Sequence, residues 1–412
     1  LSNASEVSDR TASSLLAGLQ DASPVTQAEL ERRILLLSDL PGVLARSTLR
    51  PGTTPGTADV VVQLAAGPKV GGSLELDNQG NHYTGANRVG ASLYVNEPMG
   101  WGDMASARLL TSGEGLSYGR VAYQSLVGPF TVGVATSSLY YQLSGAFARL
   151  ESSGTAHTGS AFASYPLLRS RQQNLSVQWS LDHKDFNDRT GAGSPSQATK
   201  TTQIHTLGLK GNHQDAMGQR ALQYNAAWAM GTLSLQDATT RNNDAITAQS
   251  NGAFDKLVYG VSWQQELAQK RSLYLSLNGQ SASKNLDASE KFSLGGTGGV
   301  RAYPAGEASG DEGFVLTMEG RIPWPALSQY LAGSAQAVAF IDTGTATANK
   351  SPWDSGASTK RRTLSGAGFG LNFTSPNKWT ATAYCAVKVG DEVATSAPDA
   401  TWRVWLQAAK FF

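Results

Sequence analysis

Residues 272–278 read Ser-Leu-Tyr-Leu-Ser-Leu-Asn, and the three leucines alternate with polar or amphipathic side chains. Successive side chains of a β-strand point to opposite faces of the sheet, so this stretch has one apolar face and one polar face. The same period of two continues from Gly67 to the C-terminus. It is clearest in residues 88–96, 175–182 and 314–321. This part of the chain is therefore predicted to be all-β.

The length of these runs bears on the choice between a membrane barrel and a water-soluble sandwich, whose strands alternate as well. Runs of about ten to twelve residues suit tilted strands that cross the hydrocarbon layer. Long polar inserts alternate with tight turns, as unequal loops on the two sides of a membrane would. The inserts are residues 190–202, 237–252 and 345–360, and two of the turns are residues 97–102 and 113–115. We therefore predict a transmembrane barrel.

The size of the β-region sets the number of strands. The 346 residues from Gly67 to Phe412 allow about sixteen antiparallel strands, at roughly 20–22 residues per strand and connection. The last strand is expected to carry Trp402 and Val404 on its apolar face and to end at the aromatic C-terminus, Phe412. A final strand of this form is how outer-membrane proteins present themselves for assembly. The predicted fold class is an all-β transmembrane barrel over residues 67–412.

Residues 1–66 follow a different pattern and are predicted to form a small α+β domain. Leu30, Ile34 and Leu37 recur at helical spacing, and the Pro/Gly pair after them ends the helix. The expected elements are a helix over 8–18, a helix from an N-cap at Thr26 to Ser38, and strands over 43–50 and 58–64 around a turn at 51–56. Leu1–Ser5 are expected to be a trimmed start of the chain, and the opening strand of the domain is expected to be missing.

Composition excludes several classes of function. The chain has 33 Lys+Arg and 32 Asp+Glu, so its net charge of +1 gives no reason to expect nucleic acid as a partner. One cysteine, Cys385, excludes an internal disulfide and any multi-cysteine metal site. The five histidines show no ligand spacing, and Asp182 and His183 would point to opposite faces of a strand. We expect no catalytic residue, no metal, no cofactor and no enzymatic activity.

The most informative stretch is residues 292–321, which read FSLGGTGGVRAYPAGEASGDEGFVLTMEGR. A glycine-rich segment with Gly295 and Gly296 leads to Val300-Arg301-Ala302-Tyr303, and a polar turn precedes a strand with Glu319 and Arg321. The segment lacks the Gly-Lys-Ser/Thr ending of a phosphate loop. About twenty residues downstream, Phe340-Ile341-Asp342-Thr343-Gly344 lies within another strand.

These stretches resemble those of the two-partner secretion transporters of the outer membrane, the TpsB family, whose superfamily includes barrel-assembly insertases. In that family a long loop folds into the lumen, and the arginine at its tip pairs with the aspartate of a Phe-x-Asp-x-Gly strand. The resemblance implies that Arg301 pairs with Asp342 and so locks a loop of about residues 285–312 in the lumen. Val300, Tyr303, Gly295, Gly296, Glu319, Arg321, Phe340 and Gly344 would then form the loop tip and its supporting motif. Ala302 stands where the family usually has glycine.

The resemblance extends to the front of the chain, where residues 26–64 are similar to the later part of the periplasmic POTRA domain nearest the barrel. Two such domains, a plug helix and a linker are typical of the family, so residues 1–66 are expected to be a partial POTRA domain. The resemblance implies that an extended substrate adds a strand to its edge. The expected docking surface contains Leu30, Ile34, Val43 and Leu44.

The implied function is export of a partner polypeptide through the barrel lumen, in two-partner (type Vb) secretion. The implied partners are a secreted protein with an N-terminal secretion domain, the lipids and lipopolysaccharide of the bacterial outer membrane, and the barrel-assembly machinery during biogenesis. The cargo could be an adhesin, a haemolysin or a contact-dependent toxin, and we expect a monomer. Two alternatives stay open: an insertase that assembles outer-membrane barrels, and a diffusion porin.

Overall fold

The computed structural model describes residues 1–19, 25–53, 57–191, 196–353 and 361–412. At the front of the chain, two helices pack on one small sheet of strand order β1-β3-β2. Its elements are β1 (Ser2–Ala4), α1 (Asp9–Leu16), α2 (Gln27–Ser38), β2 (Val43–Pro51) and β3 (Ala58–Ala66). The Thr26 hydroxyl accepts a hydrogen bond from the Glu29 amide and caps α2 as predicted. This α+β arrangement fits a POTRA domain.

The opening strand of this domain is present, and the expectation that it is missing is wrong. β1 lies within the segment Leu1–Ser5 and pairs in parallel with β3, with Ser2 opposite Gln63. Three residues are too few to reveal a period of two in the sequence, so only the tertiary pairing identifies them as a strand. The turn predicted at 51–56 lies in part outside the described residues.

Among the described residues, sixteen antiparallel strands close into a barrel, as predicted. They are β4 (Val70–Asp77), β5 (Arg88–Asn96), β6 (Met104–Thr111), β7 (Leu116–Val127), β8 (Phe130–Gln142), β9 (Ser153–Arg169), β10 (Gln173–Thr190), β11 (Ser196–Gln214), β12 (Arg220–Leu235), β13 (Gly252–Glu266), β14 (Ser272–Ala282), β17 (Glu312–Pro323), β18 (Ser334–Thr347), β19 (Arg361–Thr374), β20 (Trp379–Lys388) and β21 (Trp402–Phe411). β4 pairs with β21 and closes the cylinder, which removes every free strand edge.

The strands are unequal in length, from eight residues in β4 to nineteen in β11. The sequence predicted strands of about ten to twelve residues. β10 shows why some strands are longer than that. Its outward-facing residues are apolar up to Leu181, and then His183 and Asp185 follow on the same face. Polar outward side chains indicate that the strand has left the hydrocarbon layer. The long strands therefore continue beyond the membrane, on the side away from the α+β domain.

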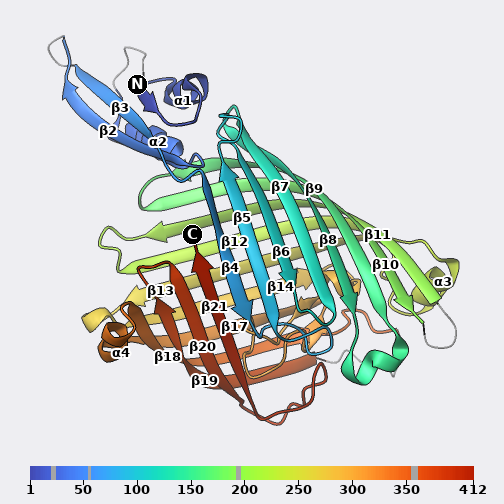
Figure 1. Ribbon diagram of the computed structural model, residues 1–412. Helices are drawn as coiled ribbons and strands as arrows, with labels where there is room; N and C mark the ends of the chain where they lie inside the picture. The colour runs from blue at the N-terminus through green and yellow to red at the C-terminus, as the bar shows by residue number, and fades with distance from the viewer. Residues whose placement is uncertain (20–24, 54–56, 192–195, 354–360) are drawn as a thin grey trace.

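The connections differ between the two ends of the barrel. Figure 1 shows the α+β domain at one end and α3 (Ala238–Ile246) at the other. α3 fills most of the insert predicted at 237–252, whereas part of the insert predicted at 190–202 belongs to β11. The turn at 97–102 lies at the end nearer the α+β domain, and the turn at 113–115 lies at the far end among the long inserts.

The remaining parts of two predicted inserts, residues 192–195 and 354–360, lie outside the described residues. A short helix, α4 (Pro325–Tyr330), connects β17 to β18. No α-helix in the described ranges is both long and apolar enough to cross a bilayer.

Candidate functional site

The candidate site is the long connection between β14 and β17, which folds into the barrel. Two short strands, β15 (Phe292–Ser293) and β16 (Ser309–Gly310), pair with each other and form the neck of this loop. Beyond the neck, residues 294–307 make a compact tip whose side chains join a buried cluster with β17, β18 and β19. The tip contacts Glu319 and Asp342, which lie on the inward faces of β17 and β18. The loop therefore occupies the lumen.

Close backbone packing shapes the tip and explains its glycines. The Gly295 amide donates to the Glu307 carbonyl, and a Cβ at Gly295 would lie 2.1 Å from the Pro304 carbonyl oxygen. Gly296 has φ +105°, a backbone conformation that side-chain-bearing residues rarely adopt. A Cβ at Gly299 would lie 2.0 Å from the Leu294 carbonyl oxygen. The predicted Gly295 and Gly296 are both needed, and Gly299 joins them.

Arg301 is the centre of the site, and the structure brings it together with Asp342. Its side chain donates from Nε to Asp342 Oδ2 at 2.8 Å and from Nη2 to Asp342 Oδ1 at 2.8 Å. The Arg301 amide also donates to Asp342 Oδ2, at 3.1 Å, and the Thr317 hydroxyl donates to Asp342 Oδ1. Asp342 is 0% exposed and Arg301 is 4% exposed. This is a bidentate, charge-assisted pair removed from water.

Glu319 is a second acceptor for Arg301, which the motif alone did not reveal. Arg301 Nη1 donates to Glu319 Oε1 at 2.7 Å, and Arg321 Nη2 donates to Glu319 Oε2 at 2.7 Å. Asp342, Arg301, Glu319 and Arg321 thus form a row of alternating charges with no net charge. Two charges can be buried together at tolerable cost only when each is paired and hydrogen-bonded, and this row meets that condition. Strand register brings Glu319 to this place, because it pairs with Phe340, two residues from Asp342.

Aromatic rings surround the guanidinium group. Its central carbon lies 3.4 Å from the centre of the Phe340 ring and 5.2 Å from that of Tyr384. The Trp405 indole donates from Nε1 to the Arg301 carbonyl at 2.7 Å. A cation over an aromatic face is attracted by the ring quadrupole, more strongly when water is excluded. Phe340, predicted as part of the strand motif, therefore acts as the floor of the arginine site.

The remaining motif residues lie close to this pair. Val300 is 0% exposed and packs in the same cluster. A Cβ at Gly344 would lie 2.7 Å from the Phe314 carbonyl oxygen and 3.1 Å from Leu294, so this position keeps room for the tip. Ala302, at the position where the resemblance implies glycine, has no positive φ and is fully buried against Gly366. The missing methyl of Gly366 makes the space that Ala302 needs.

A second anchor, not predicted, lies at the end of the tip. Glu307 is 0% exposed and accepts hydrogen bonds from Arg362 on β19 and from the amides and hydroxyls of Thr395 and Ser396. Burial alone would raise the pKa of Glu307, but these donors lower it to about 2. Tyr303 adds a hydrogen bond from its hydroxyl to the Glu392 carbonyl. From sequence alone, a glutamate in a polar loop is predicted to be exposed to solvent. Only the fold reveals that Glu307 is buried.

The four residues expected to dock a substrate do not share one surface. Val43 is 5% exposed and belongs to the core of the α+β domain, and Ile34 packs against that core. Leu30 is partly buried, whereas Leu44 is 55% exposed. β2 is an edge strand of its sheet, so its backbone is available for pairing. The exposed edge and Leu44 are what remains of the predicted docking surface.

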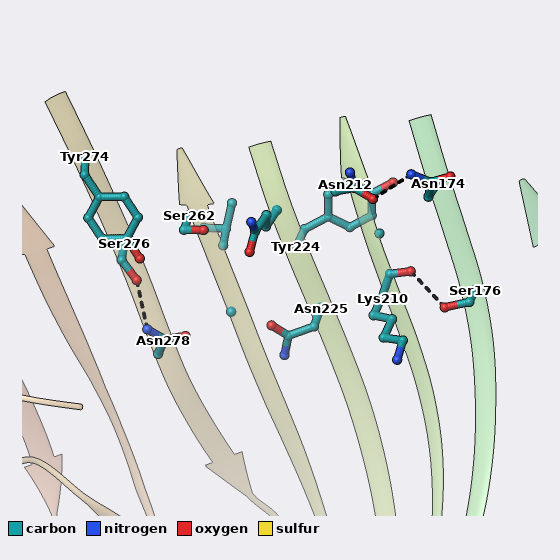
Figure 2. A pocket seen from close by; sticks show the side chains of 14 residues that line it. Asn174, Ser176, Lys210, Asn212, Tyr224, Asn225, Ser262, Tyr274, Ser276 and Asn278 are labelled. Carbon is teal, nitrogen blue, oxygen red and sulfur yellow. Dashed lines mark hydrogen bonds between the residues drawn. The ribbon is translucent and has the colours of Figure 1, made fainter. Parts of the chain in front are cut away.

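The barrel wall on β10 to β14 carries a polar pocket of about 780 Å³. Figure 2 shows amide and hydroxyl side chains from these neighbouring strands along the pocket. Asn174 on β10 donates a hydrogen bond to Asn212 on the neighbouring β11, and Asn278 donates one to Ser276 within β14. Lys210 is its one charged lining residue. Within the described ranges, no group of three or more His, Cys, Asp or Glu side chains could hold a metal ion.

Comparison with known proteins places this architecture in a family. Residues 56–373 match the family model of the haemolysin secretion/activation proteins ShlB/FhaC/HecB. The heme/hemopexin transporter protein HuxB of Haemophilus influenzae (strain 86-028NP) is 31% identical over 85% of this chain and 62% of its own length. The outer membrane transporter CdiB of Dickeya dadantii is 23% identical over 77% of this chain and 57% of its own length. The chain thus spans about 62% of the HuxB relative.

Two solved structures share the fold. CdiB from Escherichia coli superposes with a TM-score of 0.79 at 21% identity, over 100% of this chain and 76% of that one. BamA from Haemophilus ducreyi superposes with a TM-score of 0.64 at 10% identity, over 100% of this chain and 85% of that one. The resemblance to two-partner secretion transporters is confirmed. By its sequence from residue 56 to residue 373, this chain belongs to the ShlB/FhaC/HecB family of haemolysin secretion/activation proteins.

Proposed function

We propose that this protein exports a partner polypeptide across the bacterial outer membrane through its barrel lumen. The observation that carries the proposal is a loop folded inside a closed barrel and fastened there by the buried Arg301, which bonds both Asp342 and Glu319. In the proposal, this anchor holds the loop in the lumen at rest and releases it when the cargo arrives. A plain diffusion porin would have no use for the α+β domain at residues 1–66.

The lock follows from the energetics of buried charge. Removing one partner of a buried, hydrogen-bonded ion pair leaves an unpaired charge and costs about 3–5 kcal/mol. The tip therefore has one favoured position, with Val300, Tyr303 and the Gly295–Gly296 turn packed around Arg301. Gly344 and Phe340 shape its seat, and Glu319 and Arg321 complete the charge balance. In the proposal this set holds the resting loop and lets it shift as one piece.

Substrate docking is proposed at the front domain, residues 1–66, which would lie in the periplasm as a POTRA domain. An extended segment of the cargo would add to the free edge of β2 beside Leu44. The cargo would carry an N-terminal secretion domain and would thread outward unfolded. Its folding outside the cell would draw it through, because the periplasm supplies no ATP. The barrel, residues 67–412, would contact lipid and lipopolysaccharide, be inserted by the barrel-assembly machinery, and act as a monomer without catalysing a reaction.

We expect Arg301→Ala to reduce export of the cargo at least tenfold while the barrel still inserts. The mutation leaves Asp342 and Glu319 buried without their cation, so the tip loses its favoured position. The measurement is the amount of cargo in the medium, with the protein encoded beside this chain supplied as cargo. Folding is checked by heat-modifiable migration in gel electrophoresis.

Arg108→Ala is the matched control, because Arg108 pairs with Glu75 on the lumen wall away from the loop and is 47% exposed. That variant should export normally. Undiminished export by Arg301→Ala would overturn the role assigned to the loop. If nascent outer-membrane barrels, and no secreted protein, depend on the chain, the insertase alternative replaces export. A large and steady single-channel conductance would instead favour the porin.

A further inference from the structure

Three lysines converge on the inner wall of the barrel, in its half away from the α+β domain. Lys184 lies on β10, Lys200 on β11 and Lys256 on β13. Alternation places each of them on the lumen side, opposite the outward-facing apolar residues of the same strands. We call Lys184, Lys200 and Lys256 the lysine triad. The Arg301 site uses none of them.

The loop's own carboxylates occupy the triad. Glu290 accepts from Lys184 Nζ at 2.7 Å through Oε1 and from Lys256 Nζ at 2.8 Å through Oε2. Asp287 accepts from Lys200 Nζ at 3.0 Å. The Glu290 side chain is 4% exposed, and those of the three lysines are 13–25% exposed. The wall therefore already shows how it binds two carboxylates three residues apart.

These contacts fasten the ascending arm of the loop, residues 286–290, separately from the tip. Lys256 Nζ and Gln280 Nε2 also donate to the Glu290 carbonyl, at 3.0 and 2.9 Å. Leu286 packs in an apolar cluster of the same wall, with Ile204, Leu233 and Phe254 among its members. No side chain is shared with the row of charges at Arg301. The arm and the tip can thus be released by different events.

The lysine triad needs another anion as its counter-charge whenever the ascending arm is displaced. Lys184 and Lys256 have no other carboxylate partner among the described residues, so displacement of Glu290 leaves two like charges on a half-buried wall. Like charges without a counter-charge destabilise the charged forms, and the cost is largest where water is scarce. Lys200 keeps Asp188 at 3.7 Å. An incoming carboxylate is therefore the natural replacement for Glu290.

We propose that the lysine triad is a binding site for an acidic segment of the transported polypeptide, which takes the place of Glu290 and Asp287 and so releases the ascending arm. The inference rests on the proposed export function, since it takes the cargo to be a polypeptide in the lumen. Two carboxylates three residues apart satisfy all three ammonium groups in the resting loop. An Asp/Glu-rich segment of an extended chain offers the same groups at a similar reach.

The test uses fluorescein-labelled hexaglutamate as the probe and fluorescence anisotropy of the purified protein in detergent as the readout. Lys184→Gln/Lys256→Gln should weaken binding at least tenfold, because the site loses two of its three cations. Asp287→Asn/Glu290→Gln should strengthen binding about tenfold, because a site that is no longer filled by its own loop is fully available to the probe. Competition for one site predicts these opposite signs, and a lumen lysine outside the triad, Lys210, separates that competition from a general effect of lumen charge.

Lys210→Gln is the matched control: Lys210 lies on the same strand as Lys200, lines the polar pocket and forms no ion pair with any residue that the structure describes. It should bind hexaglutamate as the unchanged protein does. Equal weakening by Lys210→Gln, unchanged or weaker binding by the carboxylate variant, or equal competition by inorganic phosphate would each overturn the inference.

Release of the arm has its own readout. A nitroxide at Ala288→Cys, in a Cys385→Ser background, should become mobile when hexaglutamate is added and stay immobile with hexalysine. Ala288 is exposed, so the label itself does not disturb the contacts. Hexaglutamate that binds without mobilising the label would contradict the release. Failure of these binding tests while the unchanged protein still secretes its cargo would refute the triad alone, and absence of secretion would refute the proposed function.

Discussion

Arg301 makes several kinds of favourable contact at once. Two carboxylates, an aromatic floor and a backbone carbonyl held by Trp405 all act on one residue of the loop tip. Because the row of four charges is neutral and three of its members, Arg301, Glu319 and Asp342, are buried, the tip is specific in position without a large electrostatic penalty. The same balance means that a single substitution unbalances the whole row.

Glycine spacing at the tip supports a sharp prediction. Gly299→Ala should displace the tip and reduce export, because its Cβ would lie 2.0 Å from the Leu294 carbonyl oxygen. Gly298→Ala should be nearly neutral, because nothing lies within 4 Å of the added Cβ. Protease protection of residues 294–307 measures the displacement, and cargo in the medium measures export. Equal behaviour of the two alanine variants would show that close packing does not determine the tip.

At the residue scale, the sequence predicted the contact of Arg301 with Asp342 through the resemblance of two motifs. It did not predict Glu319 as a second acceptor or Glu307 as a buried anchor. Both depend on which residues face one another across strands and loops, and register is a tertiary property. Val43 was expected at a docking surface between the helix that ends at Ser38 and the strand that follows it, but its side chain belongs to the core of the α+β domain.

Among the elements, the turn between β5 and β6 carries a buried acid in an unusual state. Glu97 is 3% exposed, has φ +51°, and one of its carboxylate oxygens has no partner in the described part of the chain. Burial raises the pKa of Glu97 from 4.5 to about 7, although the amides of Gly102 and Asp103 oppose the shift. The folded turn therefore binds a proton near neutral pH that the unfolded turn does not.

This shift predicts the pH dependence of the turn. The folded pKa exceeds the unfolded value, so the stabilisation is complete below about pH 4.5 and is lost as pH rises through 7. Hydrogen exchange of residues 97–103, corrected for intrinsic rates, should thus be faster at pH 8 than at pH 6. Glu97→Gln should abolish this difference, whereas Glu114→Gln in the exposed turn at 113–115 should not. Persistence of the difference in Glu97→Gln would identify another titrating group.

The contact between α2 and the barrel rim fixes the orientation of the front domain. Asp39 accepts from Arg169 Nε and Nη2, both at 2.7 Å, and Arg32 donates to the Pro166 and Leu167 carbonyls. Asp39→Ala should weaken this contact by about 1 kcal/mol, the upper range for an exposed pair. Distances between spin labels on β2 and on the rim should then spread more widely.

Glu29→Ala provides the comparison for that experiment, because it removes only a 3.5 Å pair with Arg33 within α2. Its distance distribution should match that of the unchanged protein. A narrow distribution in Asp39→Ala would mean that other contacts, such as the Ser8 amide with the Gly100 carbonyl, suffice to hold the domain.

Elements of this domain were predictable where capping and periodicity were strong, as in α2, and not where three residues form β1.

For the whole molecule, the sequence predicted the closed barrel and its sixteen strands because alternation is a local property that repeats. The lengths of individual strands were not predictable, since a strand that continues beyond the lipid changes the polarity of its outer face and resembles a loop. Residues 196–202 show this: they looked like part of a polar insert and belong to β11.

The unequal strands give the barrel an uneven rim. β10 has eighteen residues and β5 has nine, and about ten suffice to cross the hydrocarbon layer. At about 3.3 Å per residue and a tilt near 45°, the excess raises one flank by roughly 20 Å. At the end of the barrel away from the α+β domain, the wall is therefore high at β9–β12 and low at β4–β6. In the proposed function, a chain leaving the barrel would be screened on its β9–β12 side and open on its β4–β6 side.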